Sequence, residues 1–127
     1  MKQINTIYSE NAPKPIGPYS QALGFENLVF FSGQIAIDPA TSLMSAGDVK
    51  AQTARVCENI NAVLGAAGLG FSDVVKTTCF LTAAEDFADF NEVYSKYFTS
   101  SPARSCVFVN GLPKGARVEI ELIAVRR

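Results

Sequence analysis

The spacing of hydrophobic positions changes several times along this chain, and each change predicts a different element. Short runs of apolar and β-branched residues over 4–8, 19–23 and 28–32 predict strands. The second and third runs are separated by a turn signal at 24–27, so they predict a hairpin. Three prolines and a glycine within 12–18 exclude regular structure and predict a rigid loop between the first two strands.

Two longer stretches have the spacing of amphipathic helices. After a turn at 38–41, Asp48 can cap a helix that runs to about Ala67, and Gly68 and Gly70 then stop it. Its apolar positions recur at steps of three and four: Val49, Thr53, Val56, Ile60 and Val63. A second helix is predicted from a stripe of aromatic residues that ends before 100–102: Phe87, Phe90, Tyr94, Tyr97 and Phe98.

The remaining segments complete a sheet. The run 74–82 is rich in β-branched residues and predicts a buried strand between the helices, and two strands follow near 104–109 and 118–125. This order predicts an α+β fold in which a mixed six-stranded sheet carries both helices on one face. The strands have apolar residues in both alternation phases, as in 29–31 and 120–124, so the other face must also be covered. We expect the same sheet of other subunits to cover it.

Composition sets limits on the function. A chain of 127 residues, 48% hydrophobic and 18% charged, is expected to form one domain over 1–127 that associates with further copies. The net charge is −1 and no run of basic residues is longer than Arg126-Arg127, which disfavours a nucleic-acid partner. Without histidine, catalysis must rely on carboxylates, Tyr, Ser, Cys or backbone groups.

The cysteines and the N-terminal segment indicate the compartment. Cys57, Cys79 and Cys106 are odd in number and widely spaced, which fits free thiols better than a disulfide framework or a zinc motif. The first residues lack the apolar stretch of a signal peptide, and no apolar run is long enough to span a bilayer. We therefore expect a soluble, cytoplasmic protein. The missing histidine and the missing Gly-rich phosphate loop are consistent with a protein that needs no metal or organic cofactor.

Candidate chemistry lies in the last two predicted strands. Arg104 can hold a carboxylate through two parallel hydrogen bonds, and a nearby glutamate can move protons on an attacking water. Strand alternation puts Arg104 with Cys106 among the buried positions, and it puts Glu119 and Glu121 on one mostly apolar face. A carboxylate in such surroundings needs a partner or a function. The pairing suggests chemistry on a small organic acid.

Several motifs follow one another in order along nearly the whole chain: Gly17-Pro18-Tyr19, Ser32-Gly33-Gln34, the segment 86–91, Pro102-Ala103-Arg104-Ser105-Cys106, Leu112-Pro113-Lys114-Gly115 and Glu119-Ile120-Glu121. Together they resemble the RidA/YjgF family of reactive intermediate deaminases. The resemblance implies a chorismate-mutase-like fold and a homotrimer with a cleft between each pair of subunits. It also implies hydrolysis of enamines and imines such as 2-aminoacrylate, 2-iminopropanoate and 2-iminobutanoate to 2-keto acids and ammonia. The substrates would come from pyridoxal-phosphate-dependent dehydratases.

The same resemblance implies roles for individual residues. Arg104 would grip the substrate carboxylate, helped by the Cys106 backbone amide, and Glu119 would orient or activate the water. Tyr19 and Ser32 would complete the catalytic set and line the cleft with Gly33, and Phe87 and Asn91 would form its far wall.

Other interpretations of these residues stay open at this point. Arg104 could pair with a structural carboxylate, Glu121 could replace Glu119, and Tyr19 and Ser32 could simply pack. Cys106 has no histidine to activate its sulfur, so we assign its backbone amide rather than its thiol. Alternative functions are a non-catalytic binding or regulatory protein for 2-keto acids and, with less support, an endoribonuclease or translation inhibitor or a chaperone-like holder of unfolded chains.

Overall fold

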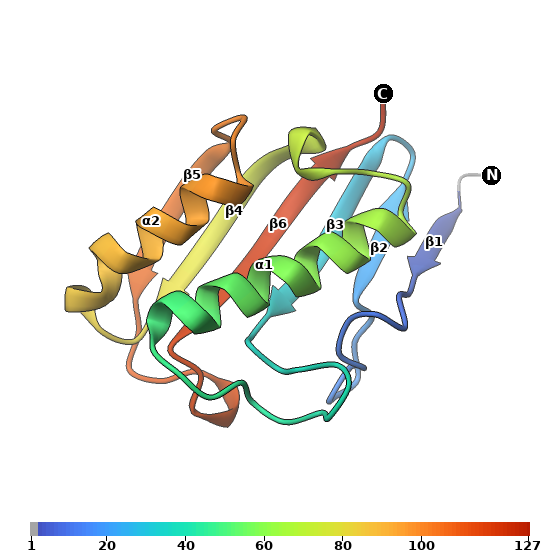
Figure 1. The fold of residues 1–127 in the computed structure, drawn as a ribbon. Coiled ribbons are helices and arrows are strands. Elements are labelled where there is room, and N and C mark those ends of the chain that lie inside the picture. The colour runs from blue at the N-terminus through green and yellow to red at the C-terminus, as the bar shows by residue number, and fades with distance from the viewer. Residues whose placement is uncertain (1–2) are drawn as a thin grey trace.

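The computed structural model describes residues 3–127 and shows one six-stranded sheet with two long helices lying across one of its faces (Figure 1). The strands and helices, in chain order, are β1 (Ile4–Ile7), β2 (Ala22–Phe25), β3 (Leu28–Gln34), α1 (Val49–Ala66), β4 (Val74–Leu81), α2 (Phe87–Tyr97), β5 (Ala103–Phe108) and β6 (Val118–Val125). Short 3₁₀ turns precede β4, α2 and β6. The predicted α+β class, the mixed sheet and the position of both helices are confirmed.

The strand order is β1-β2-β3-β6-β4-β5, so the last strand along the chain lies in the middle of the sheet. All pairs are antiparallel except β4 and β5, which are parallel and joined through α2. A parallel pair needs such a crossover, and the crossover helix covers the strands that it joins. Thus α2 lies over the β4–β5 side of the sheet and α1 over its middle (Figure 1).

The core lies between the helices and the sheet. The Asp48 side chain accepts a hydrogen bond from the Ala51 amide at 2.9 Å, so it caps α1 as predicted. Alternate residues of β6, among them Val118 and Ile120, are fully buried against the helices. None of the helices among the described residues is long and apolar enough to cross a membrane.

The face of the sheet away from the helices is open in the single chain. It carries large apolar side chains that are more than a third exposed, including Leu23, Phe30 and Val107. A cover for this face was predicted because the strands have apolar residues in both alternation phases. The exposed apolar side chains occupy the phase that points away from the helices.

The hairpin is confirmed, but its predicted bounds are wrong. Its first strand covers Ala22–Phe25 instead of 19–23, and Phe25 pairs with Leu28, which leaves a two-residue turn. Glu26 takes the left-handed conformation, with φ of 56°, that such turns require. Gly24 was assigned to the turn because glycine is typical of turns, yet it lies in the strand, where the Arg126 guanidinium occupies the space that a Cβ would fill.

Candidate functional site

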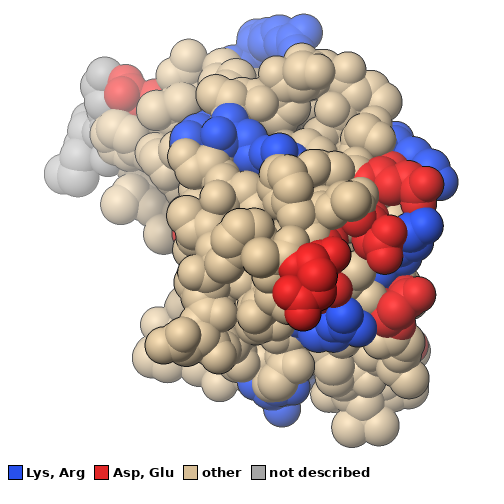
Figure 2. Space-filling view, turned by 90° about the vertical axis from the view of Figure 1, so that its left-hand side faces the viewer, with Lys and Arg blue, Asp and Glu red and all other residues tan. Residues whose placement is uncertain are grey.

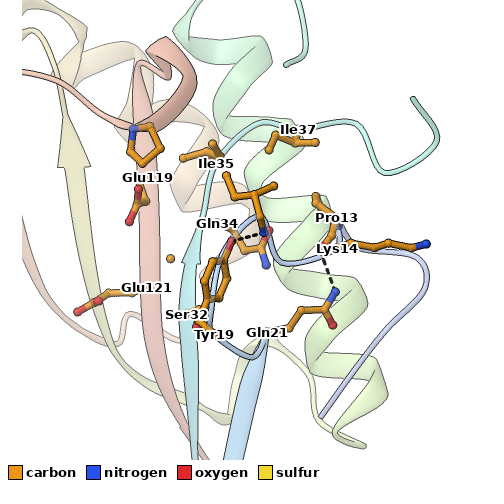
Figure 3. A pocket seen from close by; sticks show the side chains of 13 residues that line it. Pro13, Lys14, Tyr19, Gln21, Ser32, Gln34, Ile35, Ile37, Glu119 and Glu121 are labelled. Atoms are coloured by element: carbon orange, nitrogen blue, oxygen red, sulfur yellow. Dashed lines mark hydrogen bonds between the residues drawn. The ribbon is translucent and has the colours of Figure 1, made fainter. Parts of the chain in front are cut away.

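A cavity of about 390 Å³ opens where the loop before β2 passes the ends of β3 and β6 (Figure 3). Four of the predicted site residues line it: Tyr19, Ser32, Gly33 and Glu119. We call this cavity the glutamate pocket. Apolar side chains that were not predicted, such as Ile35 and Ile37, form part of its wall, and the Lys14 side chain extends away from it in Figure 3.

A β-bulge in β3 shapes the pocket. Phe31 pairs with Leu122 and Gln34 with Ile120, so Ser32 and Gly33 together oppose the single residue Glu121. Bulges re-aim the side chains around them, and they are frequent next to active sites.

Glycine at position 33 provides the space for the Glu119 carboxylate. A Cβ at Gly33 would overlap Oε2 of Glu119 and would lie 2.8 Å from Cδ and 3.0 Å from Cγ of the same side chain. The predicted grouping of Gly33 with Glu119 therefore has a steric basis.

Glu119 is half-buried, and its environment favours the protonated form. Burial raises the pKa of the Glu119 carboxyl above its ordinary value, and the negative charge of Glu121 raises it further. A carboxyl with a raised pKa can both accept and release a proton closer to neutral pH. Glu121 lies on the same side of β6 and also lines the pocket, but it is exposed, whereas Glu119 is half-buried.

The loop side of the pocket is held by hydrogen bonds. The Tyr19 hydroxyl accepts one from the Ile16 amide at 3.2 Å, and the Ser32 hydroxyl donates one to the Ser20 carbonyl at 2.6 Å. Gln21 is 2% exposed; its Oε1 accepts a hydrogen bond from the Ser9 amide, and its Nε2 donates to the carbonyls of Ser9 and Pro13. Gln21 was not predicted from the sequence, because its burial and its bonds to the loop backbone depend on how the loop folds over the start of β2.

Arg104 lies elsewhere, on the edge strand β5. Its guanidinium carbon is 4.9 Å from the ring centroid of Tyr94 and 5.7 Å from that of Phe87, and Nη1 donates to Oδ1 of Asn91 at 2.7 Å. These three residues follow one face of α2 at positions i, i+4 and i+7. We call Arg104 and these three neighbours the arginine cradle. Alternation correctly put Arg104 on the side of Cys106, but its predicted burial is wrong: an edge strand has one neighbour, and Arg104 is exposed.

The two groups of residues lie on opposite faces of the sheet. Thr77 on β4 is in register with Arg104, and its buried hydroxyl forms a hydrogen bond with Tyr94 of α2. The side chains of Thr77 and Arg104 therefore both point to the face that the helices cover. Glu119 lies between Val118 and Ile120, both buried under the helices, so its side chain points to the open face. Within one chain the sheet thus separates the arginine cradle from the glutamate pocket.

The cysteines lie on the helix-covered side. Cys79 is paired in register with Cys106, and burial raises the pKa of the Cys79 thiol to about 12. Burial also raises the pKa of the Cys106 thiol, while Arg104 opposes that effect. A thiol with a raised pKa is a poor nucleophile, which agrees with assigning no role to the Cys106 sulfur. Within residues 3–127, no cluster of His, Cys, Asp or Glu side chains has the arrangement of a metal site.

The fold and these two groups of side chains define a YjgF-like α+β protein. The chain matches the family model described as endoribonuclease L-PSP over residues 9–126, and it belongs to the RidA/YjgF/RutC family. A RutC family protein from Pyrococcus horikoshii is 53% identical over 127 residues, 99% of both chains. A 2-iminobutanoate/2-iminopropanoate deaminase from Salmonella typhimurium is 49% identical over 126 residues, 96% of this chain and 98% of the relative. Among solved structures, Escherichia coli TdcF with bound serine matches with a TM-score of 0.92 at 44% identity, and the match covers 97% of this chain and 99% of the TdcF chain.

Proposed function

We propose that this protein is a cofactor-independent hydrolase of reactive enamines and imines. Its substrates would be 2-aminoacrylate with its tautomer 2-iminopropanoate, and 2-iminobutanoate, released by pyridoxal-phosphate-dependent dehydratases in the cytoplasm. The products are a 2-keto acid and ammonia. The observation that carries the proposal is the Glu119 carboxyl, set against Gly33 in a small pocket and with a raised pKa. The Salmonella relative named as a deaminase supports the choice of substrates.

The residues of the two groups divide the reaction between them. Arg104 binds the substrate carboxylate, since only Nη1 donates to a described residue and the other guanidinium donors remain for a ligand. The Glu119 carboxylate takes a proton from water as the oxygen attacks the carbon of the protonated imine, which gives a neutral tetrahedral amino alcohol. The same carboxyl then gives that proton to the nitrogen. As the C–N bond breaks and ammonia leaves, the carboxylate accepts the proton of the hydroxyl group, so the keto acid forms and the proton leaves with ammonia as ammonium. A positioned acid–base group contributes about 10²- to 10⁴-fold to such a reaction.

One chain cannot supply both groups to one small substrate, because its sheet lies between them. We infer that the arginine cradle of one copy faces the glutamate pocket of another, in a trimer of chorismate-mutase-like arrangement. The exposed apolar side chains of the open face, such as Leu23 and Phe30, support burial of that face between copies.

The chemistry is tested by following keto-acid formation from 2-aminoacrylate generated in place by a serine dehydratase. The wild type should accelerate product formation, and Arg104→Ala and Glu119→Ala should each remove most of that acceleration. A folded wild type that leaves the rate unchanged rejects the hydrolase. Binding of 2-oxobutanoate by such an inactive protein would then favour a keto-acid binding function.

The shared site has a sharper test, in which the two inactive variants complement each other. When Arg104→Ala and Glu119→Ala are refolded together, a site regains both groups if an intact Arg104 of one copy meets an intact Glu119 of another. Random mixing in equal amounts restores about one site in four. Mixtures that stay inactive while forming mixed oligomers would refute a site shared between copies.

An RNA-cleaving function, which the description of the family model names, has less support from this chain. The net charge is −1, and on the side that carries α2 and β5 acidic and basic side chains alternate without forming a continuous basic surface (Figure 2). Lys50 on this side is paired with Glu92 and lies near Asp89.

A further inference from the structure

The arginine cradle contains a residue whose position the proposed chemistry does not yet explain. Tyr94 lies on α2 below the Arg104 guanidinium, at a distance within the range of a cation–π contact. The aromatic stripe placed Tyr94 on the apolar face of the helix, and it is buried, with 7% of its surface exposed.

Tyr94 is itself held from several sides. Its hydroxyl shares a hydrogen bond of 2.8 Å with the buried hydroxyl of Thr77. Its ring stacks on Phe98, with centroids 4.3 Å apart and 21° between planes, and it packs against Phe90 at 5.4 Å. Such a ring has little freedom to turn or shift, so it is a fixed platform on which another group can rest.

Arg104, in contrast, has few constraints of its own. It is exposed on an edge strand, and its long side chain has many rotamers to lose when it binds a ligand. Thr77, which fixes the Tyr94 hydroxyl, is also the in-register neighbour of Arg104 on β4. Thus β4 fixes the backbone of Arg104, the Tyr94 ring of α2 supports its guanidinium, and Asn91 accepts a hydrogen bond from one of its donors.

We propose that Tyr94 is a positioning residue for the carboxylate-binding arginine. Its ring fixes the plane of the Arg104 guanidinium, so that the donors not used by Asn91 are already oriented toward a substrate carboxylate. The inference rests on the proposed function, in which Arg104 binds that carboxylate. Preorganisation of this kind improves binding because less conformational freedom is lost on association.

The test uses the full-length protein, with 2-oxobutanoate as the ligand in NMR titrations. Tyr94→Leu removes the ring face and should weaken binding by about 5- to 30-fold. Tyr94→Phe keeps the ring and should stay within about threefold of the wild type. Val93→Ala is the matched control, because Val93 is a buried side chain on the same helix that belongs neither to the arginine cradle nor to the ring stack around Tyr94, and it should change thermal stability but not affinity.

A double-mutant cycle with Arg104→Ala separates this inference from the proposed function. If Tyr94 acts through Arg104, Tyr94→Leu has no further effect on affinity once the arginine is gone. If Tyr94→Leu lowers the affinity equally with and without Arg104, or leaves the affinity unchanged, the role of Tyr94 is overturned and the proposed function is not affected. An unchanged affinity in Arg104→Ala overturns both the carboxylate clamp and the inference.

A measurement on the wild type keeps the inference testable if Tyr94→Leu does not fold. The Arg104 Nε–H proton should be shifted upfield by the ring current of Tyr94, and its ¹⁵N relaxation should show restricted motion without ligand. An unshifted signal with the relaxation of a free arginine side chain would overturn the proposal.

Discussion

Replacement of Gly33 by alanine should separate catalysis from stability more cleanly than a change at Glu119 itself. The added Cβ would overlap Oε2 of Glu119 and lie 2.8 Å from its Cδ, whereas ordinary contacts between such atoms are about 3.5–4.0 Å. The carboxyl must therefore move by about 1 Å, and a misplacement of that size can cost about 10²-fold in rate. The corresponding loss of transition-state stabilisation is about 2.7 kcal/mol.

The fold should tolerate the same substitution. The atoms in the way belong to the end of a flexible side chain, and the backbone of Gly33 does not have a positive φ. We expect the free energy of unfolding to change by less than about 1 kcal/mol, which corresponds to a few degrees in Tm. Gly65→Ala is the control, because no atom beyond the neighbouring backbone of its own helix lies within 4 Å of the added Cβ, and it should leave kcat/KM unchanged.

The assay is continuous keto-acid formation from 2-aminoacrylate, together with thermal unfolding of each variant. Gly33→Ala in a Glu119→Ala background should cause no further loss, since the group that it displaces is already absent. A Gly33→Ala protein with kcat/KM within about threefold of the wild type would show that the position of this carboxyl does not control the reaction.

Three further predictions concern single contacts. Because the pKa of Glu119 is raised in the folded state, kcat/KM should fall as pH decreases through that pKa, and Glu119→Gln should be much slower and lose this pH dependence. The same variant should raise Tm at pH values above the folded-state pKa, but it should leave Tm unchanged at pH values below the unfolded-state pKa. Parallel series of rates and of thermal unfolding against pH would show both effects. Asp48→Ala removes the cap of α1 and should cost about 1 kcal/mol in urea unfolding without a change in kcat, whereas an equal loss of activity would place Asp48 nearer the chemistry. Gln21→Ala removes three hydrogen bonds that hold the loop at the pocket and should cost about 2–4 kcal/mol and raise KM; a variant as stable as the wild type would contradict the anchoring role.

Local signals were sufficient to predict most elements of the fold. Asp48 and the three-and-four spacing behind it predicted α1, because capping and amphipathic periodicity depend on residues close in sequence. The bulge at Ser32 and Gly33 was not predicted, since it depends on how β3 and β6 pair across the sheet. For the same reason the hairpin was displaced: the pairing of Phe25 with Leu28 decides where the turn falls.

The site could be predicted residue by residue but not as an arrangement. Alternation placed Arg104 with Cys106, and it placed Glu119 with Glu121, because each inference needs only one strand. It could not show that these two sets lie on opposite sides of the sheet, since the relative phase of β5 and β6 is set through their shared neighbour β4. Tyr94 was missed as a partner of Arg104 because an aromatic stripe on a helix ordinarily indicates core packing alone.

The separation of the two groups follows from the topology of the sheet. The parallel pair β4 and β5 requires a crossover, α2 is that crossover, and it must cover the strands that it joins. A residue of β5 in phase with Thr77 therefore meets α2, and Arg104 obtains its aromatic platform from that phase. Glu119 lies in the opposite phase of the central strand, where no helix competes for the space and a pocket can form between the loop and the bulge. The arrangement that supports each group alone also keeps the two groups apart, so the proposed chemistry requires that copies of the chain assemble.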